Sequence, residues 1–320
     1  MISMDDIITI IVPNTFFSNI RLDKVLPQLC RNYSRTCFKK WILNCQVSVN
    51  DRMCDNPNVK VSCGDKITVN IINCENGFEN PQNIPLNVVY EDNDILVIDK
   101  QVNLVVHPGA GHKDGTLLNA LLYKSNTFLN VPRAGIVHRL DKNTTGLMVI
   151  AKNLISYNNL VELMKCRKII RQYEALVYGR MISGGTICRS IKRHPVQRTI
   201  MTTNVLGRKA ITHYRIIKRL SCCTHIRIKL ETGRTHQIRV HMLSINHPLI
   251  GDSVYRNKHK FCKSITLGVY NIIKKFPRPA LHASKLCLKH PITEQWMEWD
   301  SVFPNDIANL LNELNVNESK

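Results

Sequence analysis

The sequence predicts an α+β protein with two domains, a small module of helices and strands followed by a larger domain dominated by strands. A chain of 320 residues with 44% apolar composition can bury one large and one small core. Helical spacing opens the small module, whereas period-two alternation, typical of strands, dominates the chain beyond it. Residues 76–88 hold two prolines, a glycine and several asparagines, so we expect a linker between domains at 18–75 and 89–320.

The charge balance points to a polyanionic partner. Lysine and arginine total 44 against 24 aspartates and glutamates, a formal charge of +20 with a pI near 9.6. Such an excess repels itself unless an anionic polymer is bound, so nucleic acid is the first candidate. No uninterrupted apolar run approaches the roughly 20 residues of a spanning helix, and no secretory signal is evident. We therefore expect a cytoplasmic protein without a membrane partner.

The twelve cysteines do not form a metal or disulfide pattern. No Cys-x-x-Cys pair occurs, and Cys222 and Cys223 are adjacent. Without a secretory signal, we expect reduced thiols packed as small apolar side chains. The sequence thus predicts no metal site built on cysteine.

The small module begins with two short helices. Apolar spacing predicts the first helix from Arg21, and Ser34 can cap the second. The stretch "QVSVNDRMC" then alternates as a hairpin turning at Asn50 and Asp51, and "GDKITVNII" adds a turn and another strand. Basic residues gather on the helical part, and they indicate either a solvated face or a nucleic-acid contact. The candidates for that contact are Arg21, Arg35, Lys39 and Lys40.

The large domain contains many alternating segments, among them "DILVIDK", "RQYEALVYG" and "THIRIKLETG". Helical spacing predicts helices near Leu117 to Leu122, Ile155 to Met164 and Thr235 to Ile245, the first capped by Thr116. The glycines of "HPGAGHKDG" lack the lysine and hydroxyl residue of a phosphate loop. We therefore expect a sheet with flanking helices and no nucleotide loop.

The segment "GIVHRLDKNTTGLMVIAK" places one carboxylate in a polar connection between two apolar arms, which are typical of strands. Asp141 and Thr144 fit an Asx-type turn, so this segment alone favours a turn over chemistry. The isolated segment leaves both interpretations open.

The segment "LETGRTHQIRVHMLSINHPLIGD" predicts a helix in which Arg239 lies at the edge of an apolar face. Thr235 can cap this helix. A half-buried arginine requires a carboxylate partner. The nearby histidines 236, 241 and 247 do not match the spacing of a zinc site.

A family resemblance is carried by four ordered motifs. "HRLDKNTTG", "RQYEALVYG", "ETGRTHQIRVHM" and "RPALHASKLCLKHP" are similar to the motifs of pseudouridine synthases of the RluA type. The first module, through "RLDK", "VSVN" and "GDKITV", resembles the S4 RNA-binding domain, although Asp51 stands where a glycine is usual. Asn143 and Gln101 also depart from the common pattern. The resemblance implies a mixed, mainly antiparallel sheet with flanking helices, the pseudouridine synthase fold.

The resemblance also assigns roles. It implies that Asp141 is the essential carboxylate, as nucleophile at the ribose or base at its 2′ position, that Arg239 pairs with it, and that Tyr173 stacks on the base. Leu281 and His138 would contact the substrate, and Arg139 would enter the stack left by a flipped base. No metal or other cofactor is implied, and we expect a monomer.

The implied substrate is 23S rRNA of the large ribosomal subunit, at the hairpin called helix 69. Free rRNA and an assembling subunit both remain open as its form. Two alternatives stay in view, a non-catalytic S4-domain ribosome assembly factor and a base-flipping glycosylase. The first would leave no pseudouridine, and the second would release uracil.

Overall fold

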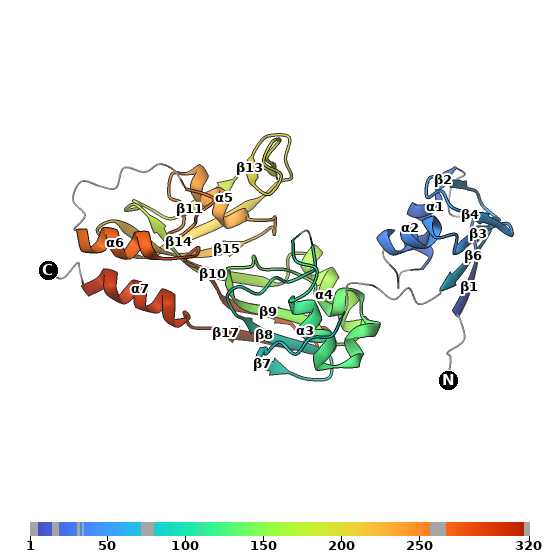
Figure 1. Cartoon of the computed structure of the whole chain (residues 1–320), viewed down its shortest axis with the longest axis horizontal. Coiled ribbons are helices and arrows are strands. Elements are labelled where there is room, and N and C mark those ends of the chain that lie inside the picture. Colours follow the sequence, from blue (N-terminus) through green and yellow to red (C-terminus); the bar gives the residue numbers. More distant parts are fainter. Residues whose placement is uncertain are drawn as a thin grey trace. The chain divides into compact units, whose positions relative to one another are not determined.

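The computed structural model describes residues 6–14, 19–30, 33, 35–71, 80–109, 111–256 and 267–316, and these form two compact units (Figure 1). The units comprise Met1–Glu79 and Asn80–Lys320. In the described part of the chain, no helix combines the length and apolarity needed to cross a bilayer. Each unit has its own core.

The first unit contains a four-stranded sheet in the order β1-β6-β3-β4. Asn50 and Asp51 join β3 to β4 with φ of 50° and 60°, so the predicted hairpin turn is confirmed and both residues adopt the left-handed conformation of a primed turn. The elements are β1 (Asp6–Ile11), β2 (Ile20–Arg21), α1 (Leu22–Leu29), α2 (Arg35–Leu43), β3 (Val47–Val49), β4 (Arg52–Cys54), β5 (Lys60–Val61) and β6 (Lys66–Ile71).

The two predicted helices of the first unit are present and pack over its sheet. Leu22, Val25 and Leu26 of α1 and Phe38 of α2 are fully buried in one core. Ser34, the predicted cap of the second helix, lies outside the described residues. The unit starts earlier than residue 18, because β1 pairs antiparallel with β6 along its whole length. Local periodicity did not reveal this pairing of distant segments.

The second unit is built on a nine-stranded sheet whose main order is β11-β14-β15-β10-β16-β9-β8-β7, with β17 beside β16. Among the described pairs of this sheet, only that of β9 with β16 is parallel, so the predicted mixed, mainly antiparallel sheet is confirmed. Its strands are β7 (Asn87–Glu91), β8 (Ile95–Lys100), β9 (Thr145–Ala151), β10 (Ile170–Tyr178), β11 (Gly185–Cys188), β14 (Ile211–Arg219), β15 (Cys223–Leu230), β16 (Leu281–Lys289) and β17 (Trp296–Asp300). A separate hairpin joins β12 (Ile191–Arg193) to β13 (Met201–Thr203).

Helices flank this sheet, and three of them were predicted. They are α3 (Leu117–Lys124), α4 (Leu154–Lys165) and α5 (Gln237–Ser244). Thr116 caps α3 as expected, since its side chain accepts the Asn119 N–H. Two further helices were missed, α6 (Leu267–Lys275) and α7 (Asn305–Val316). The signal for α7 was present, because its buried Ile307, Leu310 and Leu314 recur at helical spacing.

Residues 80–88 of the predicted linker belong to the second unit. The Asn80 carbonyl accepts a hydrogen bond from Asn119 Nδ2 at 2.9 Å, and Gln82 Oε1 accepts the Gly115 N–H at 2.7 Å. β7 then begins at Asn87. Proline and asparagine content indicated an irregular chain, but irregular backbone can still dock on a folded unit.

Gly135 is required for close packing against β9. Its φ is +76°, and a Cβ at this position would overlap the carbonyl oxygen of Ala151. We expect Gly135→Ala to lower the free energy of unfolding by about 3 kcal/mol, because strain and a backbone clash combine. Gly115→Ala is the matched control, since φ is +66° but nothing lies within 4 Å, and it should cost only about 1 kcal/mol. Urea denaturation measures both, and equal losses would contradict the packing argument.

Candidate functional site

The connection that carries Asp141 runs from η2 (Pro132–Gly135) to β9. The stretch Gly135 to Val137 is not the strand that the sequence predicted, because Ile136 makes only an isolated bridge to Ile150. The left-handed backbone of Gly135 ends the preceding turn and prevents a regular strand. A turn is present, since the Thr144 N–H donates to the Asp141 main-chain carbonyl at 3.0 Å, but this backbone bond is not the Asx-type turn that the sequence favoured.

His138 fixes this connection to β9. Its side chain is buried, and Nε2 accepts the N–H of Val149 at 3.1 Å. Burial first, then the positive charge of Arg171, lowers the pKa of His138 to about 3, so the ring is neutral. The ring faces β9 and holds the loop, and its contact with substrate stays a prediction.

Lys100 supports the same loop and was missed at the sequence level. It ends β8 with no exposed surface, and Nζ donates to the carbonyls of Gln101, Leu104 and Lys142 at 2.8, 3.0 and 3.1 Å. Burial lowers its pKa to about 7, although the nearby Asp141 carboxylate opposes this shift. The available signal was a lysine closing the buried strand "ILVIDK".

Arg239 joins two carboxylates of different character. Its Nε and Nη2 donate to Asp252 at 2.6 and 2.8 Å, whereas its Nη1 lies 3.4 Å from Asp141 Oδ2. The Asp252 side chain is 0% exposed, but that of Asp141 is 19% exposed. Burial raises the pKa of Asp252, but bonds from Arg239 outweigh this and hold it below the usual range. The predicted pairing with Asp141 exists, yet the tight partner is Asp252.

The start of α5 places a histidine beside Asp141. His236, not the predicted Thr235, is the N-cap, with φ of 54° in the left-handed region. Its Nε2 lies 3.9 Å from Asp141 Oδ1, and its Nδ1 lies 2.8 Å from the Tyr255 hydroxyl. The Tyr255 ring also covers the Arg239 guanidinium, 4.7 Å from its centroid. Neither His236 nor Tyr255 was assigned a role from the sequence.

Tyr173 and Leu281 line the apolar part of the site from adjacent strands. They are 5% and 3% exposed and belong to the same core cluster, and Leu281 lies opposite Ala175, on the same face as Tyr173. Burial raises the pKa of Tyr173, with Arg171 opposing and Asp141 adding to the rise. The structure thus brings three predicted residues, Asp141, Tyr173 and Leu281, to one region.

Arg171 is a second cation of this region that the sequence did not single out. It lies two residues before Tyr173 on β10, is 9% exposed, and its Nε has no hydrogen-bond partner among the described residues. A Cβ on Gly233 would lie 3.0 Å from its Nη1, so the glycine leaves room for the guanidinium. No carboxylate in the described part of the chain forms an ion pair with Arg171, and a buried arginine in this state favours an anionic ligand.

Arg139 is exposed, and its guanidinium makes no hydrogen bond or ion pair within the described ranges. In the first unit, two predicted RNA-contacting residues are already paired, since Arg21 Nε and Arg35 Nη2 donate to Asp23 at 3.0 and 2.6 Å. Lys39 and Lys40 are exposed. Of the four predicted RNA contacts, two are therefore paired with Asp23 of α1, and the two lysines face solvent.

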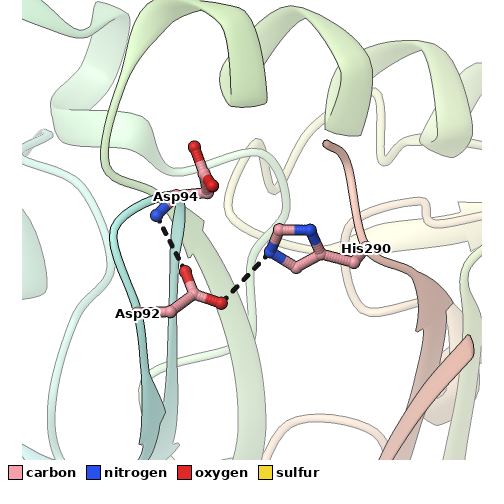
Figure 2. Close-up of side chains that lie close together, drawn as sticks. All are labelled: Asp92, Asp94 and His290. Carbon is pink, nitrogen blue, oxygen red and sulfur yellow. Dashed lines mark hydrogen bonds and ion pairs between the residues drawn. The ribbon is translucent and has the colours of Figure 1, made fainter. Parts of the chain in front are cut away.

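One group of side chains elsewhere could suggest a metal, namely Asp92, Asp94 and His290 (Figure 2). His290 Nδ1 accepts the N–H groups of Ile292 and Thr293, so Nε2 carries the proton and donates to Asp92 Oδ2 at 3.1 Å. Asp92 Oδ1 accepts two backbone N–H groups. Because the histidine has no free lone pair, we interpret this group as a polar network that fixes the β7 to β8 turn.

His241 and His247, which were considered with His236 as zinc ligands, are similarly committed. The two ring nitrogens of His241 lie 2.8 Å from Thr212 Oγ1 and 2.9 Å from the Arg189 carbonyl oxygen. His247 Nδ1 lies 2.7 Å from the Tyr178 carbonyl oxygen. Both histidines therefore fix part of the scaffold.

Comparison with known proteins agrees with this arrangement. Residues 94–244 match the family model described as RNA pseudouridylate synthase. Ribosomal large subunit pseudouridine synthase D of Buchnera aphidicola subsp. Baizongia pistaciae is 57% identical over 308 residues, covering 96% of this chain and 97% of that protein. Its namesake in Escherichia coli strain K12 is 49% identical, covering 91% and 89%.

A solved human structure, RNA Pseudouridylate Synthase Domain Containing 4, shares the fold. It aligns with a TM-score of 0.57 and 22% identity, covering 72% of this chain and 93% of that one. The family match, the extended identity to curated relatives and the shared fold lead to one assignment. The chain belongs to the family of RNA pseudouridylate synthases.

Proposed function

We propose that this protein isomerises uridine to pseudouridine in 23S rRNA of the large ribosomal subunit, at the helix 69 hairpin. The proposal is supported by extended identity to relatives named ribosomal large subunit pseudouridine synthase D and by the +20 charge. Because this substrate is a ribosomal RNA, we also propose that the enzyme works in the cytoplasm. We further propose that it acts as a monomer, either on free rRNA or on an assembling subunit.

The proposed chemistry is supported by a difference in burial and hydrogen bonding between the two carboxylates that contact Arg239. Asp252 is fully buried and takes the short hydrogen bonds, whereas Asp141 is partly exposed and only 3.4 Å from Nη1. Asp141 therefore keeps lone pairs for a substrate while Arg239 balances its charge. This suits a carboxylate that attacks the ribose or removes a 2′ proton, and both routes remain in the proposal.

The neighbouring residues fit the remaining steps. A uracil in a hairpin must leave its stack to reach Asp141, at a cost of a few kcal/mol. We propose that exposed Arg139 occupies the vacated stack, where a guanidinium can stack and contact phosphate. Tyr173 and Leu281 would then hold the flipped base, and buried Arg171 beside Tyr173 would face a backbone phosphate. No cofactor enters this scheme.

The first unit would provide a second RNA contact through Lys39 and Lys40, raising the effective concentration of substrate at the site. We expect Lys39→Gln/Lys40→Gln to weaken rRNA binding and to reduce the slope of log affinity against log salt by about 1 to 2. Lys274→Gln/Lys275→Gln is the matched control, an adjacent exposed pair on α6. Filter binding across a salt series measures both, and identical slopes in the two variants would contradict a specific role for Lys39 and Lys40.

Tritium release tests the proposed activity. The purified protein is incubated with 23S rRNA labelled with tritium at uracil C5, and pseudouridine is then mapped chemically along the RNA. We expect tritium release together with pseudouridine in the helix 69 hairpin. RNA binding without release would indicate the assembly-factor alternative, and abasic sites would indicate a glycosylase. Pseudouridine at other positions would overturn the proposed substrate and leave the reaction intact.

A further inference from the structure

The Asp141 and His236 side chains face each other across a gap that suits a hydroxyl group. Asp141 Oδ1 and His236 Nε2 are 3.9 Å apart, too far for a direct hydrogen bond. Their side chains are 19% and 21% exposed, so a ligand can reach both. Two hydrogen bonds of about 2.8 Å meeting at one oxygen span roughly 4.5 Å. A shift of about half an ångström would therefore admit a hydroxyl between them.

The hydrogen-bond network behind His236 decides which nitrogen carries its proton. The Tyr255 hydroxyl oxygen accepts the N–H of Met201 at 2.7 Å and lies 2.8 Å from His236 Nδ1. Among the described residues, no other acceptor bonds this hydroxyl. Tyr255 is 2% exposed and Nδ1 is the acceptor that the described residues offer to its hydroxyl hydrogen, so we assign this hydrogen bond to Nδ1 and the ring proton to Nε2, which is directed at Asp141.

The charge state of His236 agrees with this tautomer. Burial lowers the pKa of His236, although the negative charge of Asp141 opposes the shift. The ring is therefore a neutral donor at pH 7 and does not form a second ion pair with Asp141. The neutral N–H of His236 offers a donor, and the facing carboxylate oxygen of Asp141 offers an acceptor. A hydroxyl group, which accepts one hydrogen bond and donates another, can bind between them.

We propose that Asp141 Oδ1 and His236 Nε2 bind the ribose 2′-hydroxyl of the target uridine, and that His236 thereby makes the enzyme specific for ribonucleotides. The histidine donates to the hydroxyl oxygen, and the carboxylate accepts the hydroxyl hydrogen. The 2′-hydroxyl is the group that distinguishes RNA from DNA at a given position. The inference rests on the proposed function, since it requires the ribose of the flipped nucleotide to lie against Asp141.

A chemical double-mutant cycle tests this assignment. The probes are two hairpins in which a uridine that the enzyme is shown to modify is replaced by pseudouridine or by 2′-deoxypseudouridine, neither of which is turned over. We expect the wild type to bind the ribose form about tenfold more tightly. His236→Asn tolerates a positive φ and has no atom at Nε2, so its preference should fall to about twofold or less. His236→Gln, which can return a donor to that place, should recover most of the preference.

Two controls separate recognition from folding. Tyr255→Phe removes only the hydroxyl that sets the His236 tautomer, and its preference for ribose should also fall. His247→Asn removes a histidine whose Nδ1 lies 2.7 Å from the Tyr178 carbonyl oxygen, and its preference should stay at the wild-type value. An equal loss of affinity for both hairpins in His236→Asn would overturn the proposal. Absence of tritium release by the wild type would instead refute the proposed function.

Discussion

Replacing Asp141 with asparagine is expected to reduce kcat for tritium release by at least about 10⁴-fold, the scale of losing a nucleophile or essential base. The amide matches the carboxylate in shape, but it is neither a nucleophile nor a base at neutral pH. Binding of the RNA hairpin should change by less than about threefold, because the amide oxygen of the asparagine can still accept the 2′-hydroxyl hydrogen and Asp141 accepts no short hydrogen bond from the described residues. Single-turnover rates and affinities measured on the same RNA separate the two effects.

The matched control is Asp114→Asn, which makes the same change at an exposed carboxylate. This variant should keep the wild-type kcat. That result would exclude a general effect of net charge on RNA binding and turnover. Tritium release by Asp141→Asn at a rate near that of the wild type would refute the assigned role. In that case the partly exposed carboxylate of the site would be a turn residue, as its segment suggests when considered alone.

The second large effect is expected from Arg239→Met, which removes the cation between two carboxylates. Asp252 is 0% exposed and would be left buried without its partner, so unfolding free energy should fall by about 3 to 5 kcal/mol. For a unit of this size the melting temperature should drop by roughly 10 °C. Activity should also fall below detection, because Asp141 loses its counterion. Calorimetry and tritium release give the two readouts.

A double variant distinguishes these contributions. Arg239→Met/Asp252→Asn removes the unpaired buried charge, while the amide oxygen of the introduced asparagine can still accept the N–H groups of Val254 and Tyr255. We expect it to recover much of the stability but none of the activity. If the double variant is no more stable than Arg239→Met, the loss does not come from an unpaired Asp252.

The acid side of the stability curve provides an independent measure of this pair. The pKa of Asp252 is lowered in the folded state, so its contribution is fully present above its unfolded pKa, near 4, and is lost as pH falls toward the folded pKa. Removing Arg239 should therefore flatten the loss of stability below about pH 5. Parallel curves of unfolding free energy against pH for the wild type and Arg239→Met would argue against the ion pair as the cause of the acid-side loss of stability.

Short-range signals in the sequence predicted much of the fold. The Thr116 cap, the turn at Asn50 and Asp51, and the helical spacing of α4 depend on neighbouring residues, and the structure has each of them. Errors arose where a distant segment decided the local structure. Gly135 to Val137 has the composition of a strand but bends to pass β9, and β1 was missed because its partner β6 is far along the chain.

For the site, the sequence by itself determined which residue types are available, and its ordered motifs pointed to Asp141, Tyr173, Arg239 and Leu281. Only the tertiary structure decided their relations. It brought Arg239 to Asp141 from 98 residues away, made Asp252 the tight partner, buried His138 and Lys100 under the loop, and turned His236 toward Asp141. The physical reason is that propensities and caps act within a few residues. Burial, ion-pair distance and tautomer are set by side chains that meet only when the sheet has assembled.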